Sequence, residues 1–213
     1  MKSKLIAIAL FVAAAFTAQA QDETTTTAVK PTAGNITTEV LFNNFGDISL
    51  NNGLLRARYF ASDDLAYRLS LGLTYDYDKL SEEAHTSVFG LTLAPGIEKH
   101  FAGTNRLSPY IGAELPISIR SANYEDDDTT IKGATSMGGA NRGYFSVGLN
   151  AVAGVDFYFA KHFYAGVELG TGLSYFKNSE IEVEGPFNSK SEGFHSVRFG
   201  QFVNGGIRVG YVF

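Results

Sequence analysis

The end of this chain alternates between apolar side chains and small or polar ones, and its last residue is aromatic. One line holds Val203, Ile207, Val209, Tyr211 and Phe213, and the other holds Asn204, Gly206, Arg208 and Gly210. A period of two places the two lines on opposite faces of a β-strand. Because most soluble domains end in a frayed polar tail, a final residue that continues the apolar line is unusual for a soluble domain.

The same alternation recurs along the chain, and the sequence predicts eight strands. They lie at about 36–43, 53–61, 65–77, 85–101, 107–120, 143–159, 163–177 and 195–213. The connections after the second, fourth and sixth strands are short, whereas those at 44–52, 78–84, 121–142 and 178–194 are longer. Short turns at one end and long loops at the other are typical of outer-membrane β-barrels, with both termini on the periplasmic side.

The N-terminal residues have the pattern of a secretory signal. Lys2 and Lys4 precede an apolar run at 5–16, and Ala-Gln-Ala at 18–20 is a small-residue cleavage site. We therefore expect residues 1–20 to be removed, 21–34 to form a disordered polar leader, and 35–213 to form the barrel domain. After the signal no apolar run reaches about 18 residues, so no membrane-spanning helix is expected. The absence of cysteine excludes a lipoprotein anchor.

The alternation alone does not say which face lies inside, because a soluble lipocalin-type barrel would turn its apolar line inward. Glycine dominates the polar line here, and aromatic residues gather near the ends of the apolar line, as in the interfacial girdles of membrane barrels. These aromatic residues are Tyr59, Tyr67, Tyr75, Phe89, Phe101, Phe145, Phe159, Phe163, Tyr175 and Tyr211. The sequence thus predicts an all-β, eight-stranded, antiparallel up-and-down transmembrane β-barrel with its apolar line facing lipid.

The inward line of such a barrel carries six arginines, six carboxylates and no lysine. Nine of them form the predicted lumen ionic network: Glu39, Arg56, Arg58, Arg68, Glu98, Glu114, Asp156, Glu168 and Arg208. Asp76, Arg120 and Arg198 complete the inward set. Since unpaired charges in a narrow lumen cost several kcal/mol, we expect mutual pairing, with Glu168 and Arg208 on neighbouring strands as the first pair. A lumen closed by this network is the main interpretation, and a charged conducting pore is the alternative.

Other chemistry receives little support from the sequence. His195 and Ser196 are adjacent in a strand and face opposite ways, while His85 and Ser87 share a face without a third orienting group. The acidic run at 125–128 could hold Ca²⁺, but its spacing matches no calcium loop and a solvated loop is the simpler interpretation. We expect no enzyme activity, no cofactor and no metal. The net charge of −5 provides no basic footprint for nucleic acid.

Two stretches carry a family resemblance. The final Arg-Val-Gly-Tyr-Val-Phe at 208–213 and the Arg-Tyr-Phe at 58–60 followed by Ser-Asp-Asp-Leu-Ala-Tyr-Arg-Leu at 62–69 resemble the small outer-membrane β-barrel family of the OmpX, Ail and OmpA-barrel type, in its Bacteroidetes form. The resemblance covers about 35–213. It implies a Gram-negative outer-membrane location, and it implies that Val209, Tyr211 and Phe213 are recognised by the barrel-assembly machinery.

The function expected from this resemblance is a structural or cell-surface interaction role. The expected partners are outer-membrane lipid and lipopolysaccharide, the barrel-assembly machinery, and an extracellular ligand bound through loops 121–142 and 178–194; we expect a monomer. A narrow channel for small solutes, OmpW-like or porin-like, is the alternative, although the polar lumen argues against a hydrophobic channel.

Overall fold

The structure, a computed structural model, describes residues 29–43 and 49–213, and the side chains of these except 41–43, 49–53 and 201–207. The expected signal at 1–20, the first part of the expected leader and most of the 44–52 connection lie outside the described residues. The strands are β1 Ile36–Asn43, β2 Ser49–Ser62, β3 Leu65–Lys79, β4 His85–His100, β5 Leu107–Glu114, β6 Ile117–Glu125, β7 Thr130–Lys132, β8 Tyr144–Ala160, β9 Phe163–Asn178, β10 Ile181–Glu184, β11 Ser189–Ser191 and β12 His195–Val212. No helix able to cross a membrane occurs in the described part.

The strands form one antiparallel sheet whose pairing returns to its starting strand. From β1 the pairings run through β2, β3 and β4, then through β5 and β6 to β8, β9 and β12. β12 pairs with β1, with Thr37 opposite Val212 and Phe42 opposite Ile207. Within the described residues these pairings make a ring of eight strand positions, one of which β5 and β6 share.

The strand predicted at 107–120 is interrupted where proline removes a backbone donor. β5 ends at Glu114 and β6 begins at Ile117, after Pro116. The register is kept across the break. Glu114 lies opposite Asn150, and Ile117, three residues later, lies opposite Val147, three residues earlier in the antiparallel strand β8. The two pieces therefore fill one strand position.

Charged and polar side chains face the inside of the ring, and large apolar ones face outward. Along β3, Arg68 and Ser70 are buried, whereas the outward side chains Tyr67, Leu69, Leu71 and Leu73 are between 43% and 61% exposed. A soluble barrel would show the opposite distribution. The predicted direction of the apolar face agrees with these exposures.

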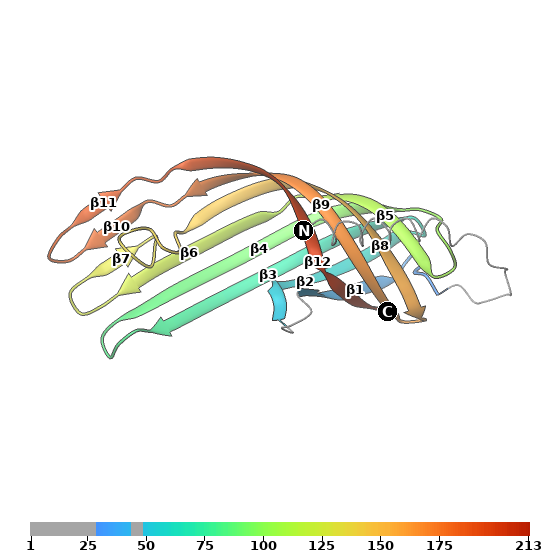
Figure 1. Cartoon of the computed structure of the whole chain (residues 1–213), viewed down its shortest axis with the longest axis horizontal. Coiled ribbons are helices and arrows are strands. Elements are labelled where there is room, and N and C mark those ends of the chain that lie inside the picture. The colour runs from blue at the N-terminus through green and yellow to red at the C-terminus, as the bar shows by residue number, and fades with distance from the viewer. Residues whose placement is uncertain (1–28, 44–48) are drawn as a thin grey trace, which may run out of the picture.

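The two ends of the ring differ. At one end, called the terminus end, lie the short turns at 63–64, 101–106 and 161–162 together with Phe213. At the other, called the loop end, the longer connections emerge, and Figure 1 shows β7, β10 and β11 there, far from the C-terminus.

The loop end carries ordered structure that the alternation did not predict. The segments expected to be the loops 121–142 and 178–194 contain the last residues of β6 and all of β7, β10 and β11. These strands pair in the order β6, β7, β10, β11. Ile131, Ala134, Ile181 and Val183 form a small apolar core there, with Tyr124 packed against it. We call this sheet the loop-end extension.

Residues 29–34 of the expected disordered leader have defined positions in the structure, and we call this segment the ordered leader. The Ala33 amide donates to Asp63 Oδ1 at 2.9 Å, and the Lys30 ammonium donates to the Ala102 carbonyl at 2.7 Å. Pro31 is buried, and Val29 packs against the cluster of Tyr158, Tyr164 and Val212. The amino-acid composition of this segment does not reveal these contacts, because their partners lie at the terminus end of the ring.

Candidate functional site

The structure brings all nine residues of the predicted ionic network into one connected set of ion pairs. Every strand position of the ring contributes at least one of them: Glu39 from β1, Arg56 and Arg58 from β2, Arg68 from β3, Glu98 from β4, Glu114 from β5, Asp156 from β8, Glu168 from β9 and Arg208 from β12. Four guanidinium groups thus face five carboxylates in a region largely removed from water. Such burial is tolerated because each charge has several partners.

Arg58 and Arg208 hold the fully buried centre of the network. Arg58 Nη1 lies 2.7 Å from Asp156 Oδ2 and 3.1 Å from Glu98 Oε2. Arg208 Nη2 lies 2.8 Å from Asp156 Oδ1, and its Nη1 lies 3.2 Å from Glu39 Oε1. Asp156 therefore contacts two guanidinium groups, one through each oxygen, and Arg208 reaches Asp156 and Glu39 with different nitrogens of its fork, which the single ammonium of lysine cannot do.

Arg68 and Arg56 extend the network toward the loop end. Arg68 Nη1 lies between Glu98 Oε1 at 2.9 Å and Glu168 Oε2 at 2.8 Å, and its Nη2 is 2.8 Å from Glu114 Oε2. Arg56 Nη1 is 2.7 Å from a Glu39 oxygen. Arg56 and Glu114 are slightly more exposed than the rest of the network and lie at its boundary toward the loop end.

The pair expected first, Glu168 with Arg208, is the longest contact of the network, at 3.9 Å. The register between β9 and β12 shifts between Asn204 and Arg208, so Glu168 lies opposite Asn204 and Arg208 lies opposite Gly166. The shorter contacts of Glu168 reach across the lumen to Arg68. Neighbouring strands therefore do not determine the pairing in a narrow lumen.

Neutral residues that the prediction missed complete the coordination of the charges. The Tyr110 hydroxyl donates to Glu168 Oε2 at 2.6 Å, and the Tyr164 hydroxyl donates to Glu39 Oε2 at 2.8 Å. Arg56 Nε donates to the Ser70 hydroxyl at 2.9 Å. These three residues occupy inward positions, and listing every polar inward residue rather than the charged ones alone would have found them.

Glycine on the inward line provides the space that the network occupies. A Cβ on Gly166 would meet Asp156 Oδ1 and would lie 2.7 Å from Arg208 Nη2. A Cβ on Gly96 would lie 2.9 Å from Arg68 Cγ. Four arginines fit inside this ring because the backbone opposite them lacks side chains.

Three inward charges lie outside the network, toward the loop end. Arg120 Nη2 donates to Asn141 Oδ1 at 3.0 Å, and the Arg198 guanidinium lies 4.6 Å from the centre of the Phe176 ring. Asp76 is exposed. Among the described residues, none of the three makes an ion pair with the network.

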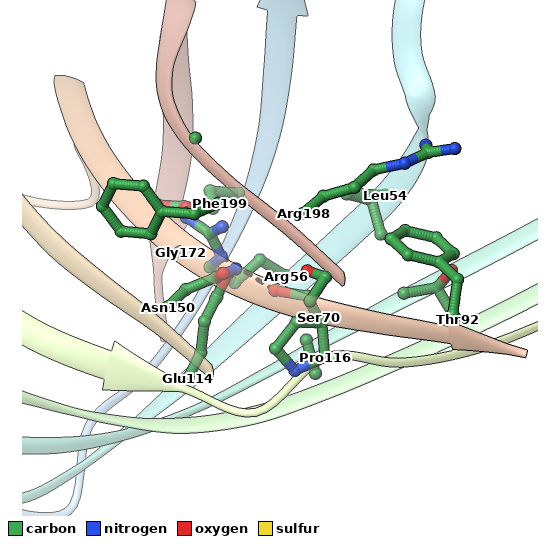
Figure 2. A pocket seen from close by; sticks show the side chains of 15 residues that line it. Leu54, Arg56, Ser70, Thr92, Glu114, Pro116, Asn150, Gly172, Arg198 and Phe199 are labelled. Atoms are coloured by element: carbon green, nitrogen blue, oxygen red, sulfur yellow. Dashed lines mark hydrogen bonds and ion pairs between the residues drawn. The ribbon is translucent and has the colours of Figure 1, made fainter. Parts of the chain in front are cut away.

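A cavity of about 460 Å³ lies on the loop-end side of the network, and Figure 2 shows the side chains that line it. Its floor includes Arg56, Ser70 and Glu114, and its walls include Pro116 and Phe176. Glu114 Oε1 accepts a hydrogen bond from Asn150 Nδ2 at 3.0 Å at the edge of this floor. Both polar and apolar side chains line this cavity.

A second cavity, of about 590 Å³, lies at the terminus end. Lys30 and Pro31 of the ordered leader line it, together with His100 and Ser108. His100 Nε2 lies 3.1 Å from Glu98 Oε2, so this cavity reaches the network from the terminus end. The two cavities have no lining residue in common, and the network lies between them.

Two other sequence features have defined positions. In the acidic run, Asp126 Oδ1 accepts hydrogen bonds from the amides of Asp128 and Thr129, and its Oδ2 accepts one from the Tyr124 hydroxyl at 2.6 Å. This carboxylate thus stabilises a turn of the extension.

The residues assigned to assembly lie at the end of β12, where Tyr211 packs edge-on against Phe213 with ring centres 4.9 Å apart. Val209 faces outward in the same line.

The crystal structure of the N-terminal β-barrel domain of Pseudomonas aeruginosa OprF aligns with 85% of this chain and 98% of its own, at 18% identity and a TM-score of 0.44. That of Ail, the attachment invasion locus protein of Yersinia pestis, aligns with 85% and 99%, at 15% identity and a TM-score of 0.42. No curated protein matches the chain. A family model described as "Putative OmpA-OmpF-like porin family" matches residues 49–213. The chain therefore belongs to the OmpA-OmpF-like porin family and is a bacterial outer-membrane β-barrel protein.

Proposed function

We propose that this chain is an eight-stranded transmembrane β-barrel with a closed lumen, which carries the loop-end extension as a surface for interaction outside the cell. The observation that carries the proposal is the extension itself. Its strands pair with one another, and β6, β7 and β10 contribute to an apolar core, so the sheet is a built element rather than a set of loops. Phe187, between β10 and β11 at the tip of the extension, is 84% exposed.

The membrane-spanning part of the proposal is supported by the distribution of side chains. Leucines and aromatic residues cover the outside of the ring, while nine charged residues are paired inside it. Closure of the lumen is supported by the network that separates the two cavities. Eight strands enclose a space that side chains can fill.

The orientation can be tested with single cysteines, because the natural chain contains none. We expect Phe187→Cys to react with a membrane-impermeant maleimide on intact cells. Asp63→Cys, in a turn at the terminus end, should react only after the outer membrane is permeabilised. The reverse labelling would contradict the proposed topology. A heat-dependent shift in gel mobility of the full chain is the accompanying check of barrel formation.

The interaction role can be tested by replacing residues 126–142 and 179–194 with short Gly-Ser turns. Cells that carry the full chain should adhere to cultured cells and to glass more strongly than cells that carry the shortened chain at an equal membrane level. Equal adhesion would contradict the role. A steady, large conductance of the full chain in planar bilayers would instead support the narrow-channel alternative and contradict a closed lumen.

A further inference from the structure

The same three residue types recur on the outer face of two strand pairs near the loop end. In each pair a lysine at the end of one strand lies directly opposite a histidine at the start of its partner. The tyrosine two residues before the lysine lies against that histidine, with ring centres 5.2 Å apart in one pair and 5.7 Å in the other. The two clusters are Tyr77, Lys79 and His85 on β3 and β4, and Tyr175, Lys177 and His195 on β9 and β12.

The two clusters differ in their neighbouring charges. His85 Nε2 lies 3.7 Å from Glu125 Oε2, so a carboxylate occupies the first cluster. In the second, the Tyr175 hydroxyl lies 2.6 Å from His195 Nδ1, and if this hydroxyl donates, Nε2 carries the ring proton and can donate outward. Among the described residues, no carboxylate forms an ion pair with Lys177 or His195. The second cluster therefore offers an ammonium and an N–H donor without a bound anion.

A broad apolar strip continues from this second cluster toward the terminus end. Tyr175 lies opposite Val197, and the next outward pair is Leu173 with Phe199. Val197 is 66% exposed and Phe199 is 75% exposed, which are high values for apolar side chains. Figure 1 shows β9 and β12 side by side along this stretch. Cationic donors thus lie at the end of a lipid-facing apolar strip.

We propose that Lys177 and His195 bind a phosphate group of the phosphorylated glycolipid of the outer leaflet, whose acyl chains lie along Val197 and Phe199, and that Tyr175 positions the His195 ring. An ammonium and a histidine N–H can each form a charge-assisted hydrogen bond with phosphate oxygens. The acyl chains remove the exposed apolar strip from water at the same time. The cluster at Lys79 binds this phosphate less well because the Glu125 carboxylate repels it. The assignment rests on the proposed function, which places the loop end on the outer-leaflet side.

The test uses the full chain folded in lipid nanodiscs and fluorescent lipid A carrying two phosphates. We expect Lys177→Gln and His195→Gln each to weaken binding about tenfold, as expected for the loss of one hydrogen bond to a charged group. Lys79→Gln and His85→Gln are the matched controls, at the same level of the other strand pair, and should change binding less than twofold. Lipid A without phosphates should bind all variants equally.

Three results would overturn the inference. Equal losses in Lys79→Gln and Lys177→Gln would mean a general effect of interfacial lysines. If the full chain bound lipid A without phosphates as tightly as lipid A with two phosphates, the affinity would come from the acyl chains. Complete competition by millimolar inorganic phosphate would identify a site for free phosphate rather than for lipid. Gel mobility separates the two proposals: a chain that does not fold as a barrel contradicts the proposed function, whereas a folded chain without selectivity contradicts only this inference.

Discussion

At the scale of single residues, the network depends on the bridging geometry of arginine. Asp156 contacts Arg58 and Arg208, and each of these guanidinium groups contacts a further carboxylate. Replacing a central arginine leaves buried carboxylates without part of their compensation. The cost of an uncompensated buried charge exceeds the net worth of the pair.

We expect Arg58→Met to lower the free energy of unfolding by about 3–5 kcal/mol, because Glu98 and Asp156 lose a shared partner. Urea titration of the folded chain in lipid vesicles measures this change. Arg198→Gln is the matched control, since Arg198 lies inside the ring but outside the network, and it should stay within about 0.5 kcal/mol. Equal losses in the two variants would contradict the structural importance of the network.

Gly166→Ala should also destabilise the chain, by about 1–3 kcal/mol, because the new methyl group would displace the ion pair of Asp156 and Arg208. Gly200→Ala provides the comparison, since a Cβ there would meet no atom within 4 Å. The same urea titration distinguishes them. If both variants were equally stable, the space opposite the network would not be limiting.

The sequence predicted which residues face inward but not which of them pair. Glu168 and Arg208 were expected together from adjacent strands, yet the shift in register beside Asn204 moves Arg208 toward Asp156. Side-chain reach across the lumen depends on strand stagger, which alternation does not encode. Tyr110 and Tyr164 followed the inward pattern, but a search restricted to charges omitted them.

At the scale of elements, the ordered leader is held by a few specific hydrogen bonds. Asp63→Ala removes the acceptor of the Ala33 amide, so this amide should exchange with solvent at least several-fold faster. Hydrogen exchange followed by NMR measures the effect. Asp64→Ala is the control, because the Asp64 carboxylate pairs with Lys99 and Ser62 instead. Fast exchange of the Ala33 amide in the unmodified chain would contradict the ordered position.

The stability of the turn at Asp126 in the loop-end extension should depend on pH. The hydrogen bond from the Tyr124 hydroxyl lowers the pKa of the Asp126 carboxyl below its ordinary value. Since the folded pKa is the lower one, the stabilisation is present above the ordinary aspartate pKa of about 3.9 and is lost as pH falls through the folded value. The Thr129 amide resonance should report this in an acid titration. The same titration in Asp126→Asn should be flat, and an identical shift in both would contradict the assignment.

Elements with a period of two were predictable, and elements fixed by tertiary contacts were not. Alternation located each ring strand, but the break at Pro116 was missed because the alternating pattern continues past it. The short strands β7, β10 and β11 lack enough residues for a periodic signal. β7 and β10 are held together because Ile131 and Val183 from distant segments pack in one small core, and β11 pairs with β10.

At the scale of the whole molecule, the extension and the ring have separate cores. The apolar cluster of the extension includes no member of the ionic network. Replacing 126–142 and 179–194 by short turns should therefore change the free energy of unfolding of the ring by less than about 1 kcal/mol. Urea titration tests this on the variant used for adhesion. A large loss would mean that the extension stabilises the ring.

The distribution of the network over all eight strand positions has a consequence for assembly. A strand that entered the lipid alone would bring an uncompensated charge, and some of its partners lie on strands far away in the chain. Glu39 and Arg208, for example, are brought together only when the first and last strands pair. A partly assembled wall therefore leaves some of these charges without their partners, and the charges favour insertion as a cooperative event in which the complete ring is the most stable state.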